Sequence, residues 1–281
     1  MSWLIGMFTF IYFIAPAGGL QVSPLLSDWL KPAKTLLLLN FLSSITLLML
    51  TSSDMTESWK SSELLRAIGA TSVGHIFCFK LAILGILLIA ANMPGLHPKK
   101  FLLIFCFTLI LPLFSSLSGH AGAEPGQFQL RILIDWIHSV AVGVWTGGLW
   151  ALYIWLGKFV CVSGLTQKSV YRVVSTFSHF ALVSTAMIFV TGIAMAYYAR
   201  IPVFHPWSSP YGALVLFKIG LFSAALCAAA INQFIHLKNA LATDQTIFAN
   251  GIRREVRIEL AFILAIFAAA GFLVRTSLPV P

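Results

Sequence analysis

Charged residues are scarce in this chain. Only 10% of its 281 residues are Asp, Glu, Lys or Arg, whereas 59% are hydrophobic. Soluble domains carry about 25% charged residues, so the composition excludes a protein that faces water on all sides. No hydrophilic stretch is long enough for a second, soluble domain. We therefore predict one integral membrane domain over residues 1–281, with an all-α fold.

The chain also lacks the motifs of several enzyme and pump classes. It has no Gly-x-x-x-x-Gly-Lys-Ser/Thr loop for ATP, no Gly-x-Ser-x-Gly elbow and no His-Glu-x-x-His pair. Neither Cys-Pro-Cys nor Cys-x-x-Cys occurs, and the four cysteines lie far apart. Free cysteines in apolar runs behave as small hydrophobic residues, which disfavours disulfides and thiolate metal sites. These absences exclude ATP-driven pumping by this chain alone and favour a protein that is not an enzyme.

Apolar runs of about 20 residues recur along the whole length, as in a bundle of membrane-spanning helices. The first run has no basic region before it and no cleavage site after it, so we expect a retained span rather than a signal peptide. The mixed-charge loop at residues 53–70 could form a helix lying on the surface. Eight spans are predicted, four in residues 1–118 and four in residues 119–281, at about 3–20, 33–52, 71–92, 101–117, 132–156, 170–199, 211–235 and 256–274.

The formal net charge of +9 is best explained as a topology signal. The basic residues do not cluster with interleaved aromatics, which disfavours nucleic acid as a partner. Odd-numbered connections hold eleven Lys and Arg residues, and the even-numbered connections with the C-terminal tail hold five. Because cytoplasmic loops carry the excess of Lys and Arg, both termini are predicted to be extracytoplasmic.

Polar groups gather near the predicted outer face, in the loop at residues 119–126 and in the span that follows it. His120 lies between glycine-containing turns, and Asp135 and His138 share one face of the fifth span because they are three residues apart. His138 lies six residues into this span, roughly 9 Å deep at 1.5 Å per residue. Ionisable groups inside lipid-compatible helices are costly, so they indicate a functional site. We interpret His120, Asp135 and His138 as candidate metal ligands.

An alternative stays open for the acidic members of this group. Asp135 could instead form an ion pair with Lys218 or Lys80, both in the outer halves of their spans. Glu124, in the same loop as His120, is expected to be solvated. For His138, the carboxylate of Asp135 would either join the metal or orient the imidazole ring.

Three further residues near the outer face are weaker candidate ligands. His205 precedes Pro206 and Trp207, a typical interfacial-aromatic setting, and is expected to face water. His75 opens the third span and could line the interior. Met195 offers a soft thioether suited to reduced copper, although methionine in an apolar helix more often packs.

The ordered motifs from Gly119 to the C-terminus resemble the central signature of the copper resistance protein D family (CopD, PcoD and YebZ). Upstream of this point the similarity is mostly hydropathic. The residues that carry the resemblance are Gly119-His120-Ala121, Asp135-Trp136-Ile137-His138, Trp145-Thr146-Gly147-Gly148-Leu149, Phe177-Ser178, Thr191-Gly192, Pro210-Tyr211-Gly212, Lys218 and Glu259-Leu260.

The resemblance implies a multi-pass protein of the bacterial inner membrane that handles copper with a periplasmic CopC-like copper-binding partner. It would place Trp145 and Lys218 in supporting roles at the site. Met55 is the only clear methionine in an outer loop, which disfavours a methionine-rich capture site for reduced copper. Nitrogen and oxygen ligands suit Cu(II) at least as well as Cu(I).

Three functions are compatible with this sequence. The leading hypothesis is a protein that accepts copper at the periplasmic face and moves it into or across the membrane. The second is a cytochrome b561-like electron carrier, in which His75 and His138 would bind haem. The third is a scaffold for copper delivery that transports nothing.

Overall fold

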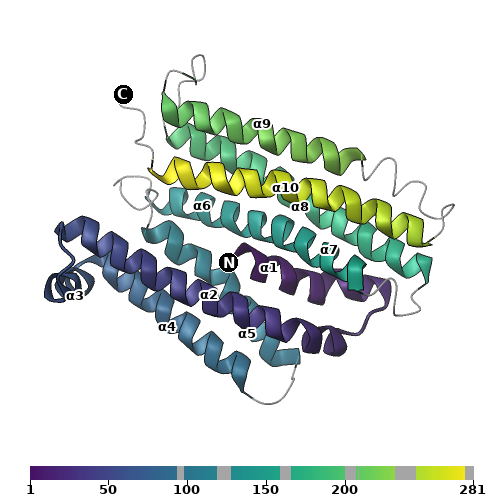
Figure 1. Ribbon diagram of the computed structural model, residues 1–281, viewed down its shortest axis with the longest axis horizontal. Helices are drawn as coiled ribbons and strands as arrows, with labels where there is room; N and C mark the ends of the chain where they lie inside the picture. The colour runs from purple at the N-terminus through teal and green to yellow at the C-terminus, as the bar shows by residue number, and fades with distance from the viewer. Residues whose placement is uncertain are drawn as a thin grey trace.

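The structure, a computed structural model, describes residues 1–93, 98–118, 128–158, 166–199, 207, 209–231 and 245–275. In these ranges the chain is helical and contains no strand (Figure 1). The elements are α1 (Ser2–Thr9), η1 (Phe10–Ile14), η2 (Ala15–Gly18), α2 (Val22–Thr56), α3 (Ser61–Ala70), α4 (Ser72–Asn92), α5 (Pro98–Ser118), α6 (Phe128–Val142), η4 (Gly143–Gly147), α7 (Gly148–Lys158), α8 (Gln167–Tyr198), α9 (Pro210–Ile231) and α10 (Gln245–Arg275).

Seven of the described helical segments are long and apolar enough to cross a membrane. Each coincides with one of the predicted spans from residue 33 onward, and α3 forms a helix in the predicted mixed-charge loop. The prediction of a polytopic all-α membrane bundle is therefore confirmed. The seven segments are Trp29–Thr56, Ser72–Asn92, Lys99–Ser118, Gln129–Gly157, Gln167–Tyr198, Pro210–Ile231 and Ile247–Leu273.

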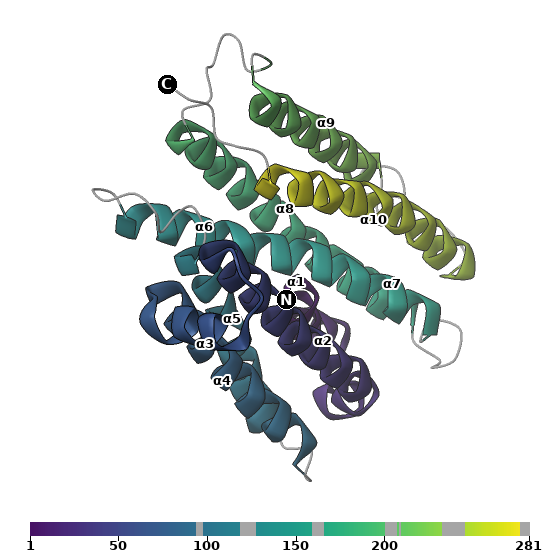
Figure 2. The ribbon, with the colours of Figure 1, turned by 60° about the vertical axis from the view of Figure 1, so that its left-hand side comes forward.

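The first predicted span differs from the expectation. It is a shorter apolar helix, Ser2–Gly18, and its first residues lie beside Gly147, in the middle of the long α6–η4–α7 segment. Both views place the start of the chain inside the bundle rather than at either end (Figures 1 and 2). Hydropathy detected the apolar run correctly, but apolar length alone does not give the depth at which a helix starts.

The α6–η4–α7 segment is the central helix of the bundle. Of its 18 most apolar consecutive residues, 61% are buried inside the protein. The corresponding share for α9 is 11%, so most of the α9 surface is left for lipid to cover. Figure 2 shows α9 and α10 on one side of α6 and α7, and α2, α3 and α4 on the other. A polar group on the central helix is thus screened from lipid more fully than one on an outer helix.

A close glycine contact joins α1 to the central helix. A Cβ added to Gly6 would collide with the backbone of Gly147 and Gly148, and one added to Gly147 would lie 2.9 Å from Trp3 Cα. Small residues let helix backbones approach closely where no hydrophobic effect separates helix from lipid. Glycine is therefore required at this crossing for steric reasons.

Two π-helical segments lie in this part of the bundle. They are η1, which continues α1, and η4, which lies between α6 and α7 and packs against α1. A π-helical turn widens the helix and rotates the side chains that follow it to a different side of the helix axis. It therefore changes which residues of α6 and α7 face the same neighbour, and such segments are frequent at functional sites.

Candidate functional site

His138 on α6 faces α8 across the bundle. Its Nδ1 lies 2.9 Å from the hydroxyl oxygen of Thr191, and the ring is half-buried. Gly192 follows Thr191 on the same side of α8, where an added Cβ would lie 4.0 Å from His138 Cε1. The imidazole is therefore held against α8 by its contact with Thr191, beside a residue without a side chain.

Two charged side chains lie in the neighbourhood of this imidazole. Asp135 lies one turn before His138 on α6, and Lys218 is on α9. Both are close enough to act on the ring electrostatically. The site therefore combines an imidazole, a carboxylate and an ammonium group from two helices, with a hydroxyl supplied by a third.

The alternative ion pairs of Asp135 are not formed. Within the described residues, neither Lys218 nor Lys80 places its amine within 4.0 Å of the Asp135 carboxylate. Lys80 is buried on α4, where its Nζ donates to Ser115 Oγ at 3.2 Å and lies 5.7 Å from the centre of the Phe77 ring. Asp135 thus keeps a carboxylate that neither lysine neutralises by direct contact.

Trp145 connects the central helix to α9. It is buried in η4, and its ring meets the edge of Phe222 with 5.5 Å between ring centres and an angle of 87°. Phe222 lies one turn after Lys218 on α9, so this contact fixes the part of α9 that carries the ammonium group. Edge-to-face aromatic pairs contribute about 0.5–1.5 kcal/mol beyond their buried area.

His75 lies elsewhere. It is in the first turn of α4, where its exposed Nε2 is 2.9 Å from the carbonyl oxygen of Gly69. The helix α4 packs on α2, α3 and α5, whereas His138 faces α8. Because a bis-histidine haem needs two histidines on facing helices, this arrangement does not support the pair His75 and His138.

The candidate ligand Met195 and a further histidine, His179, both lie on α8 but have different surroundings. Met195 is half-buried one turn beyond Thr191 and so shares its face of the helix, towards the predicted outer end. The imidazole of His179, nearer the opposite end, bonds the Ser175 carbonyl of its own helix at 2.8 Å. Met195 is therefore the nearer of the two to His138 along α8.

Two predicted ligands, His120 and His205, lie outside the described residues, as does Glu124, which was expected to be solvated. Among the residues that are described, no group of three or more His, Cys, Asp or Glu side chains is placed to hold a metal ion. The juxtaposition of His120 with His138 stays a prediction. Among the described residues, Cys78, Cys106 and Cys227 are free and exposed.

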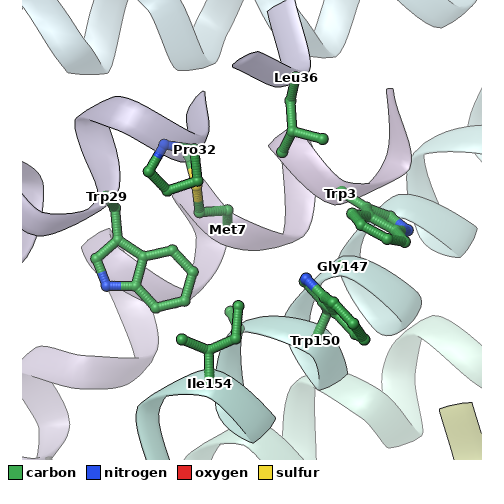
Figure 3. Close-up of a pocket in the computed structure, with 9 residues that line it drawn as sticks. Trp3, Met7, Trp29, Pro32, Leu36, Gly147, Trp150 and Ile154 are labelled. Atoms are coloured by element: carbon green, nitrogen blue, oxygen red, sulfur yellow. The ribbon is translucent and has the colours of Figure 1, made fainter. Parts of the chain in front are cut away.

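A small cavity near α1 offers a different lining. It has a volume of about 30 Å³ and is bordered by Trp3, Met7, Trp29 and Trp150, among other residues (Figure 3). Trp3 and Trp150 stack with their ring centres 4.8 Å apart. The described side chains that line this cavity include no imidazole or carboxylate.

Thr191 is among the residues that carry the family resemblance, but its contact with His138 was not apparent from the sequence. Its side chain is separated from His138 by 53 positions, and it occupies an ordinary place in an apolar helix. The same is true of Tyr198, whose ring lies 4.9 Å from the guanidinium carbon of Arg131 and joins the ends of α8 and α6. Only the packing of α6 against α8 brings these residues together.

Comparison with known proteins matches most of the chain. Residues 1–132 match the family model described as copper resistance protein D-like, N-terminal domain, and residues 171–273 match the one described as copper resistance protein D. The N-terminal match covers the part whose similarity in sequence was mainly hydropathic. Asp135 and His138 lie between the two matched ranges, whereas Thr191 and Lys218 lie within the second.

One curated relative is the copper transport protein CutJ of Bacillus subtilis (strain 168). It is 28% identical over 219 residues, which are 75% of this chain and 38% of the relative. The chain thus aligns with less than two fifths of that protein's length. No solved structure matches.

Proposed function

The chain belongs to the copper resistance protein D family, and from this premise we propose that it accepts copper at the outer face of the bacterial inner membrane and moves it into or across the bilayer. The observation that supports this most is His138, a half-buried imidazole on the central helix with a carboxylate one turn away. Imidazole and carboxylate groups replace water around a copper ion and so lower the cost of leaving water.

In this proposal the ligands act in order of depth. A periplasmic CopC-like protein delivers copper to His120, and His138 with Asp135 takes it into the bundle. His75, His205 and Met195 are secondary ligands near the same face, although the bond between His75 and Gly69 assigns one of its ring nitrogens a structural partner. The copper is cargo, and no covalent bond of a substrate changes, so the protein acts as a carrier and not as an enzyme.

The decisive experiment measures copper entry into proteoliposomes that contain a copper chelator. We expect wild-type protein to give flux and His138→Ala to lose most of it, together with most of the bound copper. His179→Ala is the matched control, because His179 is exposed on α8 and bonds only its own helix in the described structure. Equal flux and equal copper content in the two variants would refute the assignment of His138.

The same samples separate the alternatives. A scaffold would bind copper and give no flux above empty liposomes. A b561-like carrier would show a strong Soret band in the visible spectrum, and the placement of His75 on α4 away from the face of His138 argues against it.

A further inference from the structure

The backbone hydrogen bonds of Thr191 bear on how its hydroxyl meets His138. The Thr191 oxygen lies 2.5 Å from the Met187 carbonyl oxygen, 3.2 Å from that of Ile188 and 2.9 Å from His138 Nδ1. A carbonyl accepts and never donates, and a hydroxyl carries a single proton. When that proton goes to the backbone of α8, the hydroxyl oxygen is an acceptor towards the histidine.

We propose that Thr191 is a positioning residue that holds His138 in the tautomer with the proton on Nδ1 and presents Nε2 as the copper ligand. This inference rests on the proposed role of His138. A neutral imidazole carries one proton, so a protonated Nδ1 leaves the lone pair on Nε2. Metal-binding histidines commonly donate their other nitrogen to an oxygen acceptor, which fixes both ring orientation and tautomer.

The surroundings of Thr191 support this donor pattern. The residue is 8% exposed, so its hydroxyl has little water to exchange with. The carbonyl oxygens of Met187 and Ile188 both lie within hydrogen-bond distance of this hydroxyl, so its proton has acceptors within α8. The hydroxyl oxygen can then accept a hydrogen bond from the His138 ring.

The tautomer is measurable without copper. In nitrogen-15 NMR of the copper-free protein labelled at histidine, the two ring nitrogens give distinct signals, and His138→Gln identifies those of His138. We expect wild-type protein and Thr191→Ser to show a protonated Nδ1 and a bare Nε2. Thr191→Val keeps the shape but has no acceptor, so we expect it to lose this preference. A wild-type ring protonated on Nε2 would overturn the proposal.

The second measurement is copper affinity, determined by competition with a chelator of known affinity. Loss of the oxygen that accepts a hydrogen bond from a ligating histidine typically weakens metal binding by about 10–100-fold. We expect this loss for Thr191→Val but not for Thr191→Ser. Thr185→Val is the matched control, because Thr185 is also buried on α8 and its hydroxyl donates to the Leu182 carbonyl at 3.0 Å.

The two measurements distinguish the inference from the proposed function. If Thr191→Val changes the tautomer and leaves copper affinity unchanged, Thr191 does not position a copper ligand. If wild-type protein has the expected tautomer and binds no copper, the copper role of His138 fails, while the orientation of its ring by Thr191 stands.

Discussion

At the scale of single residues, the charges around His138 determine what the site can hold. Asp135 and Lys218 both act on the ring, and neither is neutralised by an ion pair with the other. A copper cation bound to His138 is attracted by the carboxylate and repelled by the ammonium group. The proposed function therefore predicts that the two side chains change copper affinity in opposite directions, whereas a purely structural role predicts no such opposition.

Substitution of each charge tests this. We expect Asp135→Asn to weaken copper binding and Lys218→Met to strengthen it, each by about fivefold or more, which corresponds to roughly 1 kcal/mol of Coulomb energy in a partly screened site. Titration of the purified variants with copper against a competing chelator measures both. Asp54→Asn, an exposed acid at the end of α2, is the control and should leave the affinity unchanged. Shifts of the same sign in both variants would contradict the electrostatic account.

The sequence predicts part of this site and not the rest. His138 and Asp135 are apparent because polar groups are expensive in an apolar helix, a rule that needs no knowledge of neighbours. The contact between Thr191 and His138 is not apparent from the sequence, because a threonine in such a helix usually bonds its own backbone. Its second partner depends on how α6 packs on α8. Contacts between distant helices are not encoded in hydropathy.

At the scale of helices, the crossing of α1 and η4 is the tightest feature of the described fold. Gly6 and Gly147 pack backbone to backbone, and Gly148 lies against the Phe177 ring. The seven long helices follow from apolar length and are predictable for that reason. The partial depth of α1 and the π-helical turn of η4 arise from this packing, so the sequence pattern does not reveal them.

Gly147→Ala tests the importance of the crossing. The added Cβ would lie 2.9 Å from Trp3 Cα and 3.0 Å from Gly6 Cα, and backbone atoms cannot move aside as a flexible side chain would. We expect a loss of about 1–3 kcal/mol in the free energy of unfolding, measured by denaturation in detergent micelles. Gly220→Ala on α9, where a Cβ meets nothing within 4 Å, should change it by less than about 0.5 kcal/mol. Equal stability of the two variants would contradict the close contact.

At the scale of the whole molecule, orientation decides which compartment His138 serves. Successive long helices alternate in direction, so α3 and the start of α6 lie at one end of the bundle and the start of α8 at the other (Figure 1). His138 is in the half of the bundle nearer the α3 end, because it lies near the start of the central helix. The excess of Lys and Arg in the connections at the opposite end predicts that the α3 end is extracytoplasmic.

Single cysteines in a background without the four native ones test this orientation. Ser61→Cys at the start of α3 and Ala121→Cys beside His120 should react in intact spheroplasts with a thiol reagent that cannot cross membranes. Lys168→Cys, exposed near the start of α8, should react only after the membrane is opened. The reverse pattern would place His138 close to the cytoplasm. Copper bound by His138 would then come from the cell interior, and delivery from a periplasmic protein would be untenable even if every copper-binding measurement succeeded.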